Sequence, residues 1–291
     1  MRLLRYLIVS GSAAAMAGAV TFSGVTASTG AAPARASHAP SARFLAEART
    51  ALVHYLRHHH PRAMLVPGRA HSIKGVTATK TFNWSGYADM SSTHQAFTKV
   101  SGNWTTPSVT CNAEDQITSN WVGLDGFNSN TVEQLGTLSW CFQGTATYFT
   151  WFEMFPAGVT QVGTSLAPGD KIAASVTRSG TGYTLKLTDS THPANSFTKT
   201  ATCALTKCLD TSAEWISERP SFSIGVAPQA HYNAFKITNG SQTNSGHTGT
   251  IGSGPGVNAL TMVDATGIYN LNTVSTLTGG NSFSTTWKNS Y

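Results

Sequence analysis

Residues 183–188 read Tyr-Thr-Leu-Lys-Leu-Thr, a strict alternation of apolar and polar side chains. A period of two predicts a β-strand with one buried face and one solvent-facing face. Similar short runs, bounded by Gly, Asn, Ser and Pro, recur from Thr81 onward at 83–88, 99–105, 120–125, 148–155, 171–177, 214–217 and 231–237. We see no amphipathic helix in this region. The pattern predicts an all-β fold, an antiparallel two-sheet sandwich or jelly roll.

The first 80 residues have a different texture. Arg2 and Arg5 precede an apolar stretch, Leu7 to Val20, and small residues follow. This predicts a secretory signal peptide over residues 1–36, hence a secreted protein with no membrane segment after signal removal. Residues 37–62 predict a helix ending at His58-His59-His60-Pro61, and residues 63–80 a linker. We expect a propeptide at 37–78 and a β-sandwich domain at 79–291; a disordered surface arm is the alternative for the propeptide.

Charge is divided unevenly between these two parts. Residues 1–77 hold nine Lys and Arg against one Glu, whereas residues 78–291 hold ten basic and twelve acidic residues. The sequence pI of about 9.2 therefore belongs to the leader, and it does not indicate nucleic-acid binding. The leader also carries six histidines. One hypothesis is that it docks over an acidic cleft near neutral pH and leaves when acid charges the histidines and neutralises the carboxylates.

The four cysteines lie in the predicted sandwich domain. In a secreted chain they predict two disulfides. Cys203 and Cys208 are near enough to close a small loop, which leaves Cys111 to pair with Cys141. Free buried thiols are the alternative.

Residues 213–220, Ala-Glu-Trp-Ile-Ser-Glu-Arg-Pro, place two carboxylates in an apolar run. In a strand, Glu214, Ile216 and Glu218 share one face, with Trp215 and Ser217 on the other. Burial of an acid raises its pKa, which suits a general acid and base. Three more predicted strands carry polar groups among aromatic residues: 119–125 with Ser119, Trp121, Gly123 and Asp125 on one face; 131–137 with Glu133 and Gln134 pointing opposite ways; and 148–155 with Trp151, Glu153 and Phe155 on one face.

Other catalytic signatures are mostly missing. The sequence has no Gly-x-Ser-x-Gly for a nucleophile elbow and no His-Glu-x-x-His for zinc. A Ser-His-Asp triad stays open because its members need only be neighbours in space. Asp210-Thr211-Ser212 is similar to one half of an aspartic-protease dyad, without a visible second half.

Four motifs resemble, in order and spacing, those of the glutamic peptidases (eqolisins): residues 121–126, 133–137, 151–156 and 213–216. The leader suggests a bacterial member. The resemblance implies a lectin-like sandwich with a Gln/Glu dyad, which it assigns to Gln134 and Glu214. It implies that Trp121, Asp125 and Glu153 line or support the site, with no cofactor and no metal. Phe155 stands where the family pattern has a tyrosine.

The expected function is a secreted acid endopeptidase that acts on proteins and peptides. In this hypothesis Glu214 activates water as a base and then serves as an acid, Gln134 stabilises the oxyanion, the propeptide inhibits, and the protein is a monomer. Two alternatives remain. One is a carbohydrate-binding sandwich, and the other is a glycoside hydrolase with Glu153 and Glu214 as paired carboxylates.

Overall fold

The computed structural model describes residues 40–291, except 69–70, 74, 113–114, 164, 205, 223–224 and 290–291. The expected signal peptide, residues 1–36, lies outside the described residues. Residues 40–291 cluster into one compact unit. No helix within the described part of the chain is long and apolar enough to cross a bilayer.

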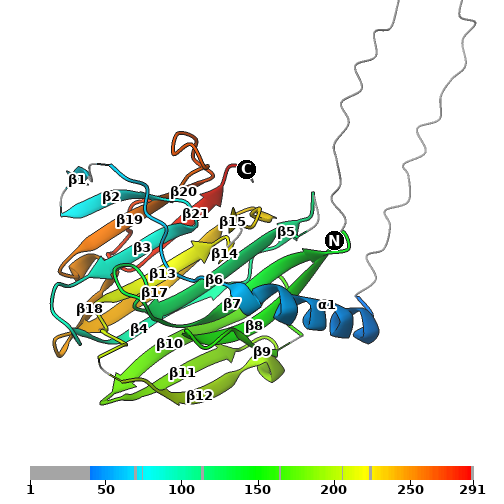
Figure 1. Ribbon diagram of the computed structural model, residues 1–291, viewed down its shortest axis with the longest axis horizontal. Helices are drawn as coiled ribbons and strands as arrows, with labels where there is room; N and C mark the ends of the chain where they lie inside the picture. Colours follow the sequence, from blue (N-terminus) through cyan, green and yellow to red (C-terminus); the bar gives the residue numbers. More distant parts are fainter. Residues whose placement is uncertain are drawn as a thin grey trace, which may run out of the picture. The chain divides into compact units, whose positions relative to one another are not determined.

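Two large β-sheets make up this unit (Figure 1). The first has nine strands in the order β1 (His71–Ile73), β2 (Val76–Thr81), β19 (Val257–Met262), β3 (Trp84–Met90), β13 (Ser212–Glu218), β6 (Ile117–Leu124), β7 (Val132–Phe142), β8 (Thr145–Phe155) and β9 (Thr160–Gly163). The second has the order β12 (Phe197–Thr202), β11 (Gly182–Asp189), β10 (Lys171–Ser179), β4 (Phe97–Thr105), β17 (Phe235–Asn244), β21 (Phe283–Trp287) and β20 (Asn272–Val274), with β18 (His247–Thr250) on β17.

Short elements complete the fold. Two small two-stranded sheets pair β14 (Ser221–Phe222) with β15 (Gly225–Val226) and β16 (His231–Tyr232) with β5 (Val109–Thr110). Two 3₁₀ turns, η2 (Pro193–Asn195) and η3 (Ile251–Ser253), lie in connections. The pairings of named strands are antiparallel, apart from β2 with β19, which is parallel.

The hydrophobic core forms between the two sheets, because alternate residues of each strand point inward. Val122, Leu135 and Trp215 of the first sheet pack with Val100 and Leu185 of the second, all of them buried. The expected sandwich and the expected strands are confirmed. Both expected disulfides are present, Cys111–Cys141 and Cys203–Cys208.

The structure corrects the prediction of a linker at 63–80. Strands β1 and β2 occupy much of it, and β2 pairs in parallel with β19, from near the other end of the chain. The backbone hydrogen bonds of β2 are supplied by a parallel strand about 180 residues further along the chain. The local sequence does not indicate such a distant partner. The division between propeptide and sandwich at 78/79 therefore falls inside a strand of the sheet.

The predicted helix is α1 (Ala42–Tyr55), continued by the 3₁₀ turn η1 (Leu56–His58). The Ser41 hydroxyl caps it by accepting a hydrogen bond from the backbone N–H of Phe44 at 3.2 Å. Leu52 and Leu56 are buried in a second hydrophobic cluster, on the outer face of the nine-stranded sheet. Figure 1 shows α1 lying across β7, β8 and β9.

Candidate active site

Glu214, Gln134 and Glu153 lie in one row across the nine-stranded sheet. Glu214 of β13 is opposite Gly123 of β6, Gly123 is opposite Gln134 of β7, and Gln134 is opposite Glu153 of β8. Directly opposite residues of antiparallel strands point to the same face. The structure therefore brings together the three residues that the sequence analysis singled out.

Gly123 separates the two members of the expected dyad. Strands lie about 4.8 Å apart, so the backbones of β13 and β7 are about 10 Å apart across β6. A Cβ atom at Gly123 would lie 3.1 Å from the Cβ of Gln134 and 3.0 Å from Cζ3 of Trp121. A glycine is therefore needed here, because a larger side chain would crowd both Trp121 and Gln134. The alternation at 119–125 predicts that Gly123 lies on this face but indicates no role for it; a glycine inside a strand is the signal that could have revealed one.

The Gln134 amide has a fixed orientation. Its Nε2 donates to Oε2 of Glu153 at 2.7 Å, and its Oε1 has no hydrogen-bond partner among the described residues. An amide NH₂ has two hydrogens to donate, so one remains for a substrate. Glu153 thus positions the amide.

The Glu214 side chain is fully buried. Neither of its oxygens has a hydrogen-bond partner by geometry in the described part of the chain. Burial, the largest influence, raises the pKa of Glu214 well above its usual range. The Ser212 hydroxyl, next in size, lowers it, and the nearby carboxyls of Asp125, Glu133 and Asp89 each raise it by less. A raised pKa was predicted for an acidic residue buried among apolar residues in a strand, and Glu214 shows it.

Trp121 contacts the second acid of β13. Its indole Nε1 donates to Oε2 of Glu218 at 2.8 Å, and its ring packs edge-on against Trp84 with centroids 4.9 Å apart. Ile216 belongs to the same cluster as Trp121, while Trp215 is in the core between the sheets. The predicted division of β13 into two faces is confirmed.

Asp125 departs from the predicted alternation. It follows the end of β6 with a φ of 65°, in the left-handed region, so its side chain leaves the Trp121 face. Its carboxylate accepts hydrogen bonds from the backbone N–H groups of Asp210 and Thr211 at 2.8 and 2.9 Å. Asp125, Glu133 and Asp210 are all buried, with one oxygen from each within 4.8 Å of the others.

This cluster of Asp125, Glu133 and Asp210 could offer oxygen ligands to a cation, but protein groups already neutralise part of it. Tyr183 donates to Oδ1 of Asp210 at 2.8 Å, and Nε of Arg178 lies 2.9 Å from Oδ2 of Asp210. Burial raises the pKa of Asp210 to about 7 and that of Glu133 well above its usual range. The raised pKa favours a protonated Glu133 beside the carboxyls of Asp125 and Asp210 in acid.

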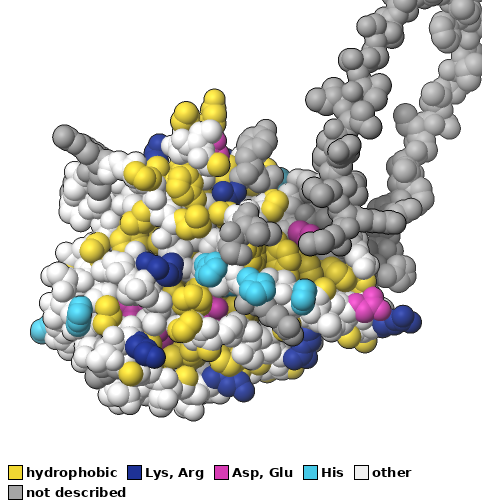
Figure 2. Space-filling model, in the orientation of Figure 1, with side chains coloured by type: hydrophobic (Ala, Val, Ile, Leu, Met, Phe, Trp, Pro, Cys, Tyr) yellow, Lys and Arg dark blue, Asp and Glu magenta, His cyan; other side chains and the backbone are white. Residues whose placement is uncertain are grey.

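Residues 42–64 cover the face that carries Gln134; we call them the covering segment. Tyr55 stacks on Trp140 of β7, with ring centroids 6.1 Å apart, and Leu52 and Leu56 pack against Leu138 beside it. The segment is also held by backbone bonds, such as Ala63 N–H to Gly126 O at 3.0 Å. Figure 2 shows histidine side chains (cyan) in a row beside α1, on a face with few Asp or Glu.

His59 of the covering segment enters the site itself and is 6% exposed. Its Nδ1 lies 3.4 Å from Oε2 of Glu153, and its Nε2 lies 3.3 Å from Oε1 of Glu218. Burial lowers the pKa of His59, but the charges and hydrogen bonds of Glu153 and Glu218 outweigh burial and raise it to about 10. The two carboxylates therefore favour the protonated, imidazolium form of His59.

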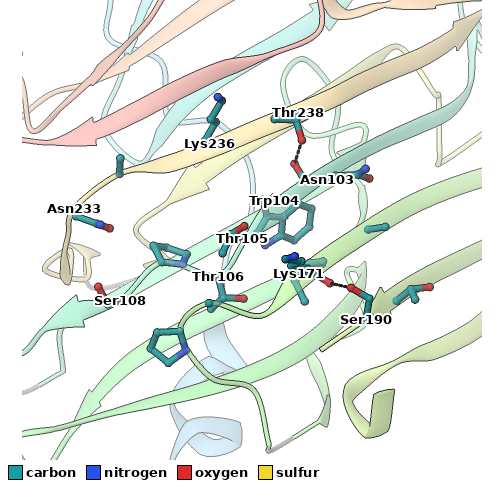
Figure 3. Close-up of a pocket in the computed structure, with 17 residues that line it drawn as sticks. Asn103, Trp104, Thr105, Thr106, Ser108, Lys171, Ser190, Asn233, Lys236 and Thr238 are labelled. Carbon is teal, nitrogen blue, oxygen red and sulfur yellow. Dashed lines mark hydrogen bonds between the residues drawn. The ribbon is translucent and has the colours of Figure 1, made fainter. Parts of the chain in front are cut away.

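A large hollow, about 810 Å³, lies away from these residues (Figure 3). It is lined by β4, β10, β11 and β17 of the eight-stranded sheet, with Lys171 and Lys236 among its polar side chains. No member of the Glu214–Gln134–Glu153 row lines it. The candidate active site is under the covering segment instead.

The sequence matches a known family. The model of the peptidase A4 family aligns with residues 82–287, more than half of the chain. The chain belongs to this family. Its peptidase A4 membership confirms the resemblance to glutamic peptidases and does not favour the carbohydrate-binding or glycosidase alternatives.

Individual relatives agree with the family assignment. Aspergillopepsin-2 of Aspergillus niger is 25% identical over 218 residues, which cover 65% of this chain and 75% of the relative. Among solved structures, scytalido-glutamic peptidase with a transition-state-analogue inhibitor has a TM-score of 0.60 at 23% identity, covering 71% of this chain and 98% of that one. Aspergilloglutamic peptidase from Aspergillus niger has a TM-score of 0.52 at 22% identity, covering 60% and 100%. The fold of this A4 peptidase is thus that of the glutamic peptidases.

Proposed function

We propose that this peptidase is an exported acid endopeptidase that hydrolyses proteins and peptides with Glu214 and Gln134, as a monomer and without a cofactor. The observation that carries the proposal is the shared row, in which the unpartnered oxygens of Glu214 and the free amide hydrogen of Gln134 flank Gly123. Residues 1–36 would serve as the signal peptide. The known family supports peptides as substrates.

The reaction needs one water and one proton carrier. The Glu214 carboxylate takes a proton from water, whose oxygen bonds to the scissile carbonyl carbon. Gln134 Nε2 donates its second hydrogen to the carbonyl oxygen as negative charge develops, an interaction worth about 3 kcal/mol. Glu214 then returns the proton to the amide nitrogen, the C–N bond breaks, and a carboxylic acid and an amine leave.

Three neighbours support this pair. Glu153 holds the Gln134 amide by accepting its first hydrogen. Trp121 closes one side of the face, next to Gly123. Asp125 adds negative charge near Glu214 and so raises its pKa. These are positioning roles, since the reacting atoms lie between Glu214 and Gln134.

The test is cleavage of a denatured protein by the acid-incubated full chain at about pH 4, with pepstatin present. We expect Gln134→Ala to lower kcat by about 100–1,000-fold and Glu214→Gln by at least that much. Asp115→Asn is the control, because it also removes a carboxylate but Asp115 is exposed and lies outside this row. Wild-type turnover by Glu214→Gln would refute the dyad.

We also propose that the covering segment is an inhibitory propeptide. It blocks the face physically, and the burial of Glu214 in the covered enzyme raises its pKa, which disfavours the carboxylate form that acts as a base. Once the segment leaves, water reaches Glu214 and its pKa falls toward the ordinary value. This second effect makes the inhibition stronger than simple steric blockage.

The direction of the pH response follows from His59. Its pKa is raised from 6.5 to about 10, so its contribution to docking is complete below about pH 6.5 and is lost as the pH rises through about 10. Acid therefore does not release the segment by charging His59, contrary to the hypothesis for the histidines as a group.

N-terminal processing tests the inhibitory role. Full-length protein held at pH 3–4 should shorten from its N-terminus, as seen by intact mass, and gain activity in step. The Glu214→Gln chain should stay full length if the cut is its own. Full activity in a chain that still carries the covering segment would overturn the proposal.

A further inference from the structure

Glu218 is a buried acid with no part in the dyad. Its side chain is fully buried at the end of β13. Of its two oxygens, Oε2 accepts from the Trp121 indole at 2.8 Å and Oε1 faces Nε2 of His59 at 3.3 Å. A buried carboxylate is costly unless it is paired. The cation that pairs it here comes from the covering segment, so its removal exposes an anion that lacks its partner.

The surroundings of His59 have the form of a side-chain pocket. Once the covering segment has left, and Leu56 with it, the groups that remain around the position of the ring are Ser119, Leu138, Trp151, Val159 and Pro220. Carboxylates stand at both nitrogens of the ring. Such a pocket accepts a flat or extended side chain that ends in a positive charge.

The pocket adjoins the candidate catalytic pair. The Glu153 oxygen that faces Nδ1 of His59 is also the oxygen that accepts from Gln134 Nε2 at 2.7 Å. A side chain in the position of His59 therefore contacts the same Glu153 carboxylate that holds Gln134, the proposed oxyanion donor. That is the distance expected of a substrate residue close to the bond that is cut.

We propose that Glu218, together with Glu153, forms a subsite that selects a substrate side chain with a positive charge, namely Lys, Arg or His, after the covering segment has left. The inference rests on the proposed peptidase function of the same site. In the covered enzyme His59 fills this subsite in place of the substrate. A neutral side chain there leaves Glu218 buried and unpaired, and this penalty is the source of discrimination.

The first test compares matched peptides that differ only by Lys or norleucine, with the change moved through each position near the cut. With acid-activated full chain, we expect kcat/KM to favour Lys by about tenfold or more at one position, mainly through KM, since hydrogen bonds to charged groups are of this strength. Glu218→Gln should bring the ratio close to one while norleucine peptides are cleaved within a few-fold of wild type. Asp115→Asn, which removes a carboxylate elsewhere, should keep the preference. A retained Lys preference in Glu218→Gln, or none in wild type, overturns the subsite.

The second test does not depend on cleavage. His59→Ala in the full chain opens the pocket between Glu153 and Glu218, and added imidazole at pH 6 should raise its Tm by several degrees. The same imidazole should not raise the Tm of His59→Ala/Glu218→Gln. If wild type cleaves neither peptide, the proposed function fails and imidazole binding alone decides the subsite. Equal responses of the two variants to imidazole would then overturn it.

Discussion

Raising the pH should lower the free energy of unfolding of this protein, and Asp89→Asn should make that decrease smaller. Asp89 lies on β3, is fully buried and faces the core between the sheets, opposite Ala213. Its Oδ1 accepts from the backbone N–H of Gly256 at 2.8 Å, a bond that an asparagine oxygen can also accept. Its Oδ2 has no hydrogen-bond partner in the described part of the chain. The substitution thus removes a charge and keeps the shape.

The magnitude follows from the pKa of Asp89. Burial raises it from 3.8 to about 6, against the opposing effect of the Gly256 and Met90 backbone N–H groups. Because the folded-state pKa is above the unfolded value, the protonated form is favoured in the folded protein, and stability falls as the pH rises from about 4 through 6. The difference corresponds to about 3 kcal/mol at 1.36 kcal/mol per unit, or about 6–12 °C in Tm.

The assay is urea unfolding of wild type and Asp89→Asn at pH values from 4 to 8, both in a Glu214→Gln background to prevent self-cleavage. We expect the two free energies of unfolding to agree near pH 4. At pH 8 the asparagine variant should be more stable by up to about 3 kcal/mol. Two parallel pH curves would refute the reasoning, because they would mean that Asp89 keeps an ordinary pKa in the fold.

Three further changes test other parts of the structure. Gly123→Ala crowds Gln134 and Trp121 and should lower kcat by about tenfold or more and the stability by about 1–3 kcal/mol; unchanged kcat would show that the close packing above β6 does not position Gln134. Leu52→Ala removes a buried contact of α1 worth about 2–4 kcal/mol and should speed N-terminal processing in acid, followed by gel; an unchanged rate would show that opening of α1 does not limit processing. Glu133→Gln replaces a carboxyl whose pKa burial raises, so its unfolding free energy should fall less than wild type between pH 4 and 8; a steeper fall would place the proton elsewhere.

The strand pattern made the sandwich and one face of the site predictable. Glu214 and Glu218 share a face because β13 is regular, and Gln134 joins them because β6 and β7 pair in register. Alternation failed where the backbone left the strand conformation, as at Asp125 with its positive φ. Its contacts with Asp210 and Thr211 join segments about 85 residues apart, which no local pattern encodes.

The role of His59 was also beyond local reasoning. His58, His59 and His60 look alike in sequence, but only His59 turns inward, through a bridge to Phe222, while its neighbours are exposed. Likewise, residues 76–81 are rich in Val and Thr, which favour a strand, but it is the pairing with β19 that places them in the sheet. In both cases the partner comes from a distant part of the chain.

The parallel pairing of β2 with β19 makes activation irreversible once the chain is cut. Leu65, the residue after the covering segment, bridges to Thr81 of β2, and β19 fixes β2 in the sheet, so that an opened segment remains tethered beside the cleft. A short tether holds its occupant at an effective concentration on the order of millimolar. Before the chain is cut, the segment therefore competes with every substrate and re-closes after each opening. After a cut between the segment and β2, it is diluted into the surroundings, and a reversible equilibrium becomes a one-way step.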